Sequence, residues 1–109
     1  MTKTQNPRIY DLEDRTLGFA KNVRVFVRKL SKTPINNEDG KQPVKASGPV
    51  GANYIEANEA LSKKDFTTRI KICRKEAKES RYWLKLIDTC SEMERENERQ
   101  YLEKEAQNL

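Results

Sequence analysis

The chain has 109 residues, enough for one domain, with 36% charged and 35% apolar residues and a net charge of +5. It contains no histidine, which excludes Ser-His-Asp and Cys-His catalysis and histidine-ligated metal sites. No Walker-type loop exists, because Gly48 and Gly51 lack the Lys-Ser/Thr that should follow. We therefore expect a non-enzymatic protein with no catalytic residue, no metal site and no cofactor.

The net charge is distributed unevenly along the sequence. Residues 1–30 carry seven basic and three acidic side chains, and residues 63–90 carry nine and four. Residues 91–109 reverse the balance, with three basic and six acidic side chains. Charge concentrated in single elements steers partners more than the mean charge does.

The first part of the chain predicts a flexible tail, a helix and a loop. Residues 1–10 are expected to form the tail, and apolar residues at helical spacing predict a helix over about 11–30. Asp11, Glu13 and Asp14 suit the positive end of its dipole. Residues 31–40 are predicted to form a loop, because Thr33-Pro34 opposes helix continuation and the residues that follow favour turns.

A second helix is expected over about 41–61. Pro43 fits its first turn, whereas Pro49 in the interior removes a backbone hydrogen bond and predicts a kink. Gly48 and Gly51 beside Pro49 would let another backbone approach closely. Beyond the kink, Leu61 is expected to complete an apolar edge.

A third helix is expected over about 63–89, opened by Ser62 and Asp65 in a sequence that resembles a capping box. Alternating steps of four and three sort its side chains into lengthwise stripes. The first stripe is apolar and consists of Phe66, Ile70, Cys73, Ala77, Ser80, Leu84 and Ile87. The second is mixed, with Asp65, Arg69, Ile72, Glu76, Glu79, Trp83, Leu86 and Cys90. The third is cationic, with Lys64, Thr68, Lys71, Lys75, Lys78, Tyr82 and Lys85.

The two cysteines, Cys73 and Cys90, lie on different stripes of this helix. Their Cα atoms would be about 25 Å apart, too far for a disulfide within one chain. We expect both to be small core residues in a reducing compartment. The N-terminal residues are polar and no run approaches 18 apolar residues, which favours a soluble, cytoplasmic protein.

The last helix is expected over about 92–109, and its composition is polar and acidic. It would form poorly unless it docks on the rest of the protein. Four helices with short connections predict an all-α, antiparallel up-and-down four-helix bundle, in which the second helix is kinked near Pro49 and the last is short.

Three blocks of sequence carry a family resemblance. They are SGPVGANYIEA (residues 47–57), SKKDF (residues 62–66) and KEAKESRYWL (residues 75–84). In this order and spacing they resemble the bacterial four-helix-bundle proteins that are encoded in intervening sequences of 23S ribosomal RNA genes. The shared signature covers about residues 45–87, and the first helix matches only in character.

The resemblance implies an antiparallel four-helix protomer that assembles as a homopentamer. Related proteins act as accessory factors of diversity-generating retroelements, where they partner a reverse transcriptase and bind nucleic acid through a basic surface. The chain departs from the family at Pro49, where Ser or Thr is usual, and it ends at Leu109, inside what would be the family's last helix. We therefore expect a shortened last helix.

The strongest functional candidate is the cationic side of the third helix. Three like-charge pairs at i,i+4 spacing, Lys71–Lys75, Arg74–Lys78 and Arg81–Lys85, each cost a few tenths of a kcal/mol. A face selected only for solubility would mix signs more evenly. We predict a nucleic-acid-binding surface composed of Lys64, Lys71, Arg74, Lys75, Lys78, Arg81, Tyr82 and Lys85.

Other residues of this region are predicted to be structural. Carboxylates near an apolar seam require partners, so we expect a polar network that contains Asn53, Glu56, Glu76 and Glu79, with Arg69 or Arg24 as the cation. Core or subunit-interface anchors are expected at Phe66, Ile70, Trp83 and Leu84.

Two functional hypotheses follow. In the first, an oligomer of this chain is an accessory factor that binds RNA or DNA through the basic surface. In the second, it is a scaffold or adaptor that binds another protein, and the basic surface is solvated or is neutralised by the acidic C-terminal helix.

Overall fold

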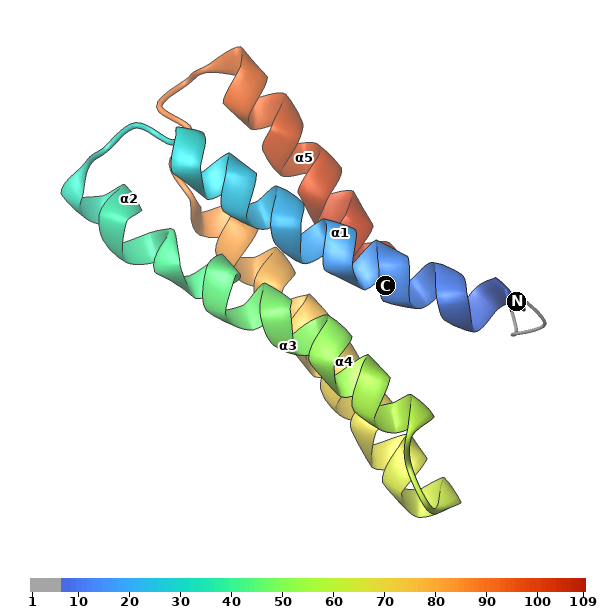
Figure 1. The fold of residues 1–109 in the computed structure, drawn as a ribbon. Coiled ribbons are helices and arrows are strands. Elements are labelled where there is room, and N and C mark those ends of the chain that lie inside the picture. The colour runs from blue at the N-terminus through green and yellow to red at the C-terminus, as the bar shows by residue number, and fades with distance from the viewer. Residues whose placement is uncertain (1–6) are drawn as a thin grey trace.

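A computed structural model describes the backbone of residues 7–109 and the side chains of residues 12–109. Over this range the protein is helical and contains no β-strand. The helices are α1 (Pro7–Lys29), α2 (Pro34–Asp39), α3 (Lys41–Asn58), α4 (Lys63–Leu86) and α5 (Met93–Asn108) (Figure 1). The predicted all-α class is confirmed, with four long helices and one short one.

The four long helices form a ring in which each contacts two others. The packed pairs are α1 with α3, α3 with α4, α4 with α5, and α5 with α1. In Figure 1, α3 and α4 lie together along their lengths, and their connecting turn lies away from α1 and α5. We call this projecting part, residues 55–66, the α3–α4 tip. The molecule is elongated as a result, with extents of 45 × 27 × 17 Å.

The core lies where α1, α5 and the end of α4 meet. Its buried residues recur on one face of α1 at the predicted helical spacing and are joined by residues of α4 and α5: Phe19, Val23, Phe26, Leu30, Leu84, Ile87, Leu102 and Ala106. We call this set the core cluster. Burial of these side chains supplies the main stabilisation of the bundle. Because Leu102 and Ala106 belong to it, the otherwise polar α5 is held by docking, as expected.

The apolar stripe of α4 is buried over only part of its length. Cys73, Ala77, Ser80 and Leu84 are buried, whereas Phe66 in the first turn is 43% exposed. The difference follows from the fold, because the α3–α4 tip extends past the helices that cover the rest of the stripe. Leu61 in the same tip is fully exposed, so the prediction that it continues the apolar edge of α3 is wrong.

The segment 31–40 was predicted to be a loop, and this is wrong in part. It contains the six-residue helix α2, which begins at Pro34. Thr33 caps the helix by accepting a hydrogen bond from the Asn36 amide at 3.0 Å, and proline is well suited to the first helical position. The Thr-Pro pair therefore stops one helix and starts another.

Several helix boundaries differ from the predicted ones. Residues 7–10 were assigned to a flexible tail but belong to α1, while the rest of that predicted tail, residues 1–6, lies outside the described range. α3 ends at Asn58, three residues early, and α4 ends at Leu86, before an extended Ile87. The start of α4 is as predicted, because the Ser62 side chain accepts a hydrogen bond from the Asp65 amide at 3.0 Å.

Cys90 corrects the prediction that both cysteines are core residues. Cys73 is buried in α4, but Cys90 is exposed in the turn between α4 and α5. Cys90 and Ser91 both have positive φ angles, of 56° and 62°, so the chain reverses direction there instead of continuing the helix. Burial raises the pKa of the Cys73 thiol, which keeps that sulfur protonated and unreactive.

The contact between α1 and α3 depends on Gly51. A Cβ atom at this position would lie 2.8 Å from the Thr16 hydroxyl oxygen and 3.2 Å from Thr16 Cβ. Only glycine leaves room for this approach, so the close packing predicted for this region is confirmed at Gly51. Pro49 lies inside α3, and the kink predicted there stays a prediction.

Candidate nucleic-acid interface

The cationic residues predicted from the sequence lie along one exposed side of α4. We call them the α4 basic face: Lys64, Lys71, Arg74, Lys75, Lys78, Arg81, Tyr82 and Lys85. All are exposed except Arg81, which is half-buried. Lys71, Arg74, Lys75 and Lys78 together line a shallow, open depression to which no other described residue contributes. The helical repeat therefore brings the central cations of the predicted set together.

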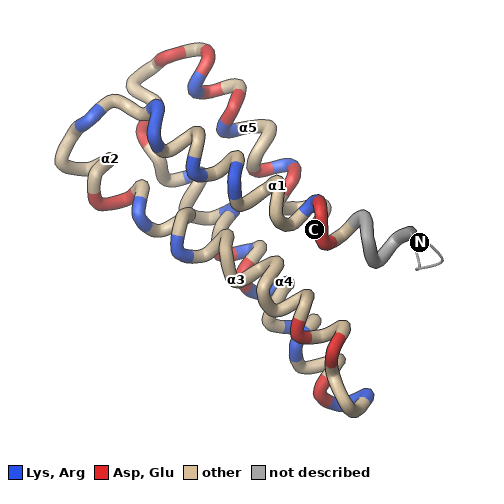
Figure 2. The backbone as a smooth tube through the Cα atoms, viewed as in Figure 1, with Lys and Arg blue, Asp and Glu red and all other residues tan. Residues whose placement is uncertain are grey.

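The acidic helix α5 does not neutralise this face. Its glutamates pair with Lys29 of α1 (Lys29 Nζ to Glu98 Oε2, 3.0 Å) and, within α5, with Arg95 and Arg99. Among residues 12–109, no ion pair joins an α5 carboxylate to the α4 basic face. The reason is geometric, because α5 packs against α4 and α1 with Leu102 and Ala106, and its glutamates point elsewhere. Figure 2 shows acidic and basic positions alternating within α5 itself.

Within α4, the basic face has little internal compensation. Lys75 Nζ lies 3.7 Å from Glu76 Oε2, the carboxylate of the next residue. Arg69 pairs with Asp65 at 3.9 Å, but neither residue belongs to the face. Exposed pairs of this kind contribute little free energy and are weakened further by salt. The ammonium groups of the face are thus available to an external polyanion.

Tyr82 adds an exposed aromatic ring to the α4 basic face. It is 59% exposed, and its ring meets that of the half-buried Trp83 edge-on, with centroids 5.2 Å apart and planes at 77°. This edge-to-face contact gives the Tyr82 ring a packing partner on one side. An exposed ring beside cations can stack on an unpaired nucleobase.

The predicted polar network is not assembled as a unit. Asn53 does meet an arginine, since its Oδ1 accepts a hydrogen bond from Arg69 Nη1 at 3.3 Å, and Glu76 is largely buried beside Lys75. Glu56 and Glu79 are exposed, so they need no buried partner. The second stripe of α4 lies at the edge of the buried surface, which leaves the Glu79 carboxylate in water, and Glu56 is on an exposed position of α3.

The four predicted anchors fall into three environments. Leu84 is completely buried in the core cluster, and Ile70 and Trp83 are half-buried. Phe66 is exposed at the α3–α4 tip. Only Leu84 is thus a core residue of the single chain.

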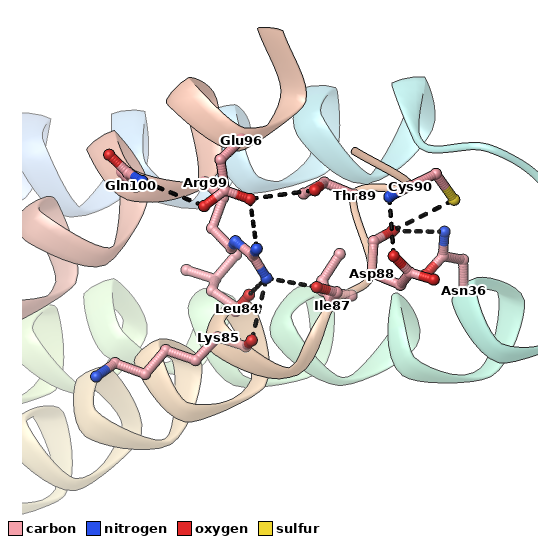
Figure 3. A network of polar contacts seen from close by, with 10 residues as sticks. All are labelled: Asn36, Leu84, Lys85, Ile87, Asp88, Thr89, Cys90, Glu96, Arg99 and Gln100. Carbon is pink, nitrogen blue, oxygen red and sulfur yellow. Dashed lines mark hydrogen bonds and ion pairs between the residues drawn. The ribbon is translucent and has the colours of Figure 1, made fainter. Parts of the chain in front are cut away.

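A polar network that was not predicted joins α5 to the end of α4 (Figure 3). Arg99 Nη1 donates hydrogen bonds to the carbonyl oxygens of Lys85 at 3.0 Å, Leu84 at 3.4 Å and Ile87. These carbonyls lie at the end of α4, where intrahelical donors are missing. The positive guanidinium also suits the negative end of the helix dipole. Arg99 therefore caps α4 from a different helix.

Glu96 completes this network. Its carboxylate accepts hydrogen bonds from Arg99, from Thr89 Oγ1 at 3.1 Å and from Gln100 Nε2 at 3.2 Å. The hydrogen bond from Arg99, followed by those of Gln100 and Thr89, lowers the pKa of Glu96 below its ordinary value. The Glu-x-x-Arg spacing within α5 was visible in the sequence, but the carbonyls that Arg99 binds are set by the fold.

A solved structure is similar to this chain over most of the length of both proteins. It is a protein of unknown function from the S23 ribosomal protein family of Bacteroides thetaiotaomicron VPI-5482. The two chains are 28% identical, with a TM-score of 0.69, and the alignment covers 88% of each. The likeness supports the resemblance to the 23S intervening-sequence proteins at the level of fold.

No protein-family model matches the chain, and no curated protein matches it. Of the helices in the described part of the chain, none combines the length and the apolar character that a membrane crossing requires.

Proposed function

We propose that this protein is a non-enzymatic accessory factor that binds RNA or DNA through the α4 basic face. The observation that carries the proposal is the absence of compensation: within residues 12–109, the only carboxylate paired with this face is that of the adjacent Glu76. Maintaining like charges on one face costs free energy, and binding of a polyanion would offset that cost.

The dimensions of the face suit a nucleic-acid strand. Lys71 and Lys85 are 14 positions apart on one helix, about 21 Å, which corresponds to about six phosphates at the axial rise of one strand. The contacts would be made to phosphates, so the binding would be tolerant of sequence and strongly dependent on salt. Tyr82 would add stacking on an unpaired base, which favours single strands.

We also propose a family and an oligomeric state for this protein. We place the chain among the 23S intervening-sequence proteins, as an antiparallel up-and-down bundle that forms a homo-oligomer, a pentamer by resemblance. The exposed apolar side chains of Phe66, Leu61 and Ile55 at the α3–α4 tip support self-association, because a second copy would remove them from water.

Both cysteines are free thiols, which fits a cytoplasmic location.

Replacement of Lys71, Lys75 and Lys78 by glutamate tests the proposal. Fluorescence anisotropy with a labelled single-stranded RNA should show a loss of at least about a hundredfold in affinity at low salt, because three phosphate contacts become repulsive. In a matched control, glutamate replaces the exposed Lys21, Lys63 and Lys104, which lie on three different helices, so that both variants have the same net charge. Equal affinities of the two variants would refute the α4 basic face as the binding surface.

A second candidate function is an adaptor that binds another protein through the exposed apolar residues of the α3–α4 tip. In that case a stoichiometric protein partner should co-purify with the chain. The complex should resist nuclease and about 0.5 M salt, since apolar contacts are not screened. Release of the partner by nuclease would favour the nucleic-acid function.

A further inference from the structure

A second cationic site lies between the end of α1, the short helix α2 and the start of α3. Four basic side chains line this pocket, Arg28 and Lys32 from one side and Lys41 and Lys45 from the other, and no carboxylate of residues 12–109 lines it. Lys41 has one weak ion pair, 3.9 Å from the exposed Glu38. Within the described part of the chain, Arg28 and Lys45 form no ion pair. We call this site the α1–α3 pocket; it contains no residue of α4.

The floor of the α1–α3 pocket is apolar, in contrast to the depression on α4. Val27, Leu30 and Val44 form it, and all three belong to or pack against the core cluster. Gly40 brings the α2–α3 junction onto this floor, since a Cβ atom there would lie 3.0 Å from Val27 Cγ1 and 2.8 Å from the Asn36 carbonyl oxygen. Apolar surface beneath a ring of cations fits a ligand with both an apolar face and several negative charges.

Hydrogen bonds within the chain fix the walls of the α1–α3 pocket in the absence of a ligand. The buried Asn36 in α2 donates hydrogen bonds from Nδ2 to the Ser31 carbonyl at 3.1 Å and to the Asp88 carbonyl at 3.0 Å. These bonds tie α2 to the ends of both α1 and α4, as Figure 3 shows for Asp88. Lys32 Nζ donates to the Arg28 carbonyl at 3.1 Å and so lies over the end of α1. A preformed site binds with a smaller loss of conformational entropy.

We propose that the α1–α3 pocket binds a nucleoside diphosphate or triphosphate. The planar base would cover Val27, Leu30 and Val44, and the phosphates would meet the four cations. Asn37, which is exposed at the rim, offers an amide donor and acceptor to the edge of a base. A fatty acid fits less well, because it carries one charge and a chain too long for an open, shallow site to cover.

Isothermal titration calorimetry with ADP, adenosine and pyrophosphate tests the composition of the ligand. We expect ADP to bind at least about tenfold more tightly than either half, because each half meets only one part of the pocket. Pyrophosphate binding as tight as that of ADP would show that the floor contributes nothing and would overturn the proposal. Failure of ADP to bind at all would overturn it as well.

Variants locate the site and separate it from the α4 basic face. Lys45→Glu should weaken ADP binding about tenfold or more, whereas Lys104→Glu and Lys71→Glu, equal charge changes at other exposed lysines, should have little effect. Val44→Thr, which keeps the side-chain shape, should weaken ADP binding without affecting pyrophosphate. If Lys71→Glu weakened ADP binding as much as Lys45→Glu does, ADP would bind α4 and the proposal would be wrong. This result is independent of whether RNA binds the α4 basic face.

Discussion

The two ends of the bundle differ in how far the other helices cover α4. At one end, the last turns of α4 pack against α5, Leu84 is completely buried in the core cluster, and Arg99 caps the final carbonyls. At the other end, the first turns of α4 lie beside α3 in the α3–α4 tip, and Phe66 of the same apolar stripe is 43% exposed. A continuous apolar stripe is therefore divided by the fold into a core and a surface.

Sequence periodicity therefore identifies which face of a helix is apolar, but not how deeply each part of that face is buried. Phe66 and Leu84 occupy equivalent positions in the repeat of α4. Their environments differ because α5 packs on only one part of α4, where Leu84 joins the core cluster. The exposed part of the stripe is available to a second copy or to a partner.

The largest predicted effect concerns the two ends of this stripe. Leu84→Ala should lower the free energy of unfolding by about 2–5 kcal/mol, because it leaves a cavity in the core cluster. Phe66→Ala should cost about 1 kcal/mol or less in the single chain, because its side chain is already partly in water. Urea denaturation of both variants checks the contrast.

Equal losses of unfolding free energy for Leu84→Ala and Phe66→Ala would contradict the division of the apolar stripe into a buried and an exposed part. The protein concentration sharpens the same experiment. If a second copy covers Phe66, the cost of Phe66→Ala should grow with concentration, because oligomerisation adds to apparent stability by mass action.

Two glycines provide a matched pair, Gly51 at the α1–α3 contact and Gly18 on α1 with open space beside it. Gly51→Ala should destabilise the protein by about 1–3 kcal/mol, because the added methyl group meets Thr16. Gly18→Ala in α1 should stabilise it by about 0.5–1 kcal/mol, because nothing lies within 4 Å of the new Cβ atom and alanine is the better helix former. Thermal unfolding followed by circular dichroism separates the two signs, and a stabilising Gly51→Ala would show that α1 and α3 are not in close contact.

Arg99→Ala tests the cap at the covered end. Loss of the guanidinium leaves the terminal carbonyls of α4 without these donors and Glu96 without its main partner, so we expect a loss of about 1–3 kcal/mol. Glu98→Ala, in the same helix but not at the cap, is the control and should cost less. Hydrogen exchange should show the effect of Arg99→Ala concentrated at the end of α4 and in α5, and an effect at the α3–α4 tip would argue against a local cap.

The smallest predicted effect is a dependence of stability on pH at the same network. The pKa of Glu96 is lowered in the folded protein. The stabilisation that its carboxylate gives the fold is therefore fully present above the pKa of the unfolded chain, and it is lost as the pH falls through the pKa of the folded protein. Stability should therefore decrease as the solution is acidified below the ordinary glutamate pKa of 4.5. Glu96→Gln should remove this part of the decrease, which a urea titration at several pH values would detect. An unchanged pH profile would mean that Arg99 does not hold the Glu96 carboxylate.

Much of the architecture could be predicted from the sequence, since it depends on local signals. The spacing of Phe19, Val23 and Phe26 gives the buried face of α1, and Ser62 marks the start of α4. The α4 basic face follows from the same repeat. The unpredicted features depend on contacts between distant segments or on chain reversals. Arg99 reaches the carbonyls at the end of α4 only once α5 has packed. Cys90 is exposed because α4 ends at Leu86 and the chain then turns at Cys90 and Ser91, which both have positive φ angles.

The α4 basic face is tested most sharply by the salt dependence of RNA binding. The wild type is compared with a variant in which glutamine replaces Lys71, Lys75 and Lys78. Each phosphate contact on a single strand contributes about 0.7 to the slope of log K against log salt, so the variant should lose about two units of slope. Parallel lines for the two proteins would contradict the account, because they would show that these lysines do not contact phosphates.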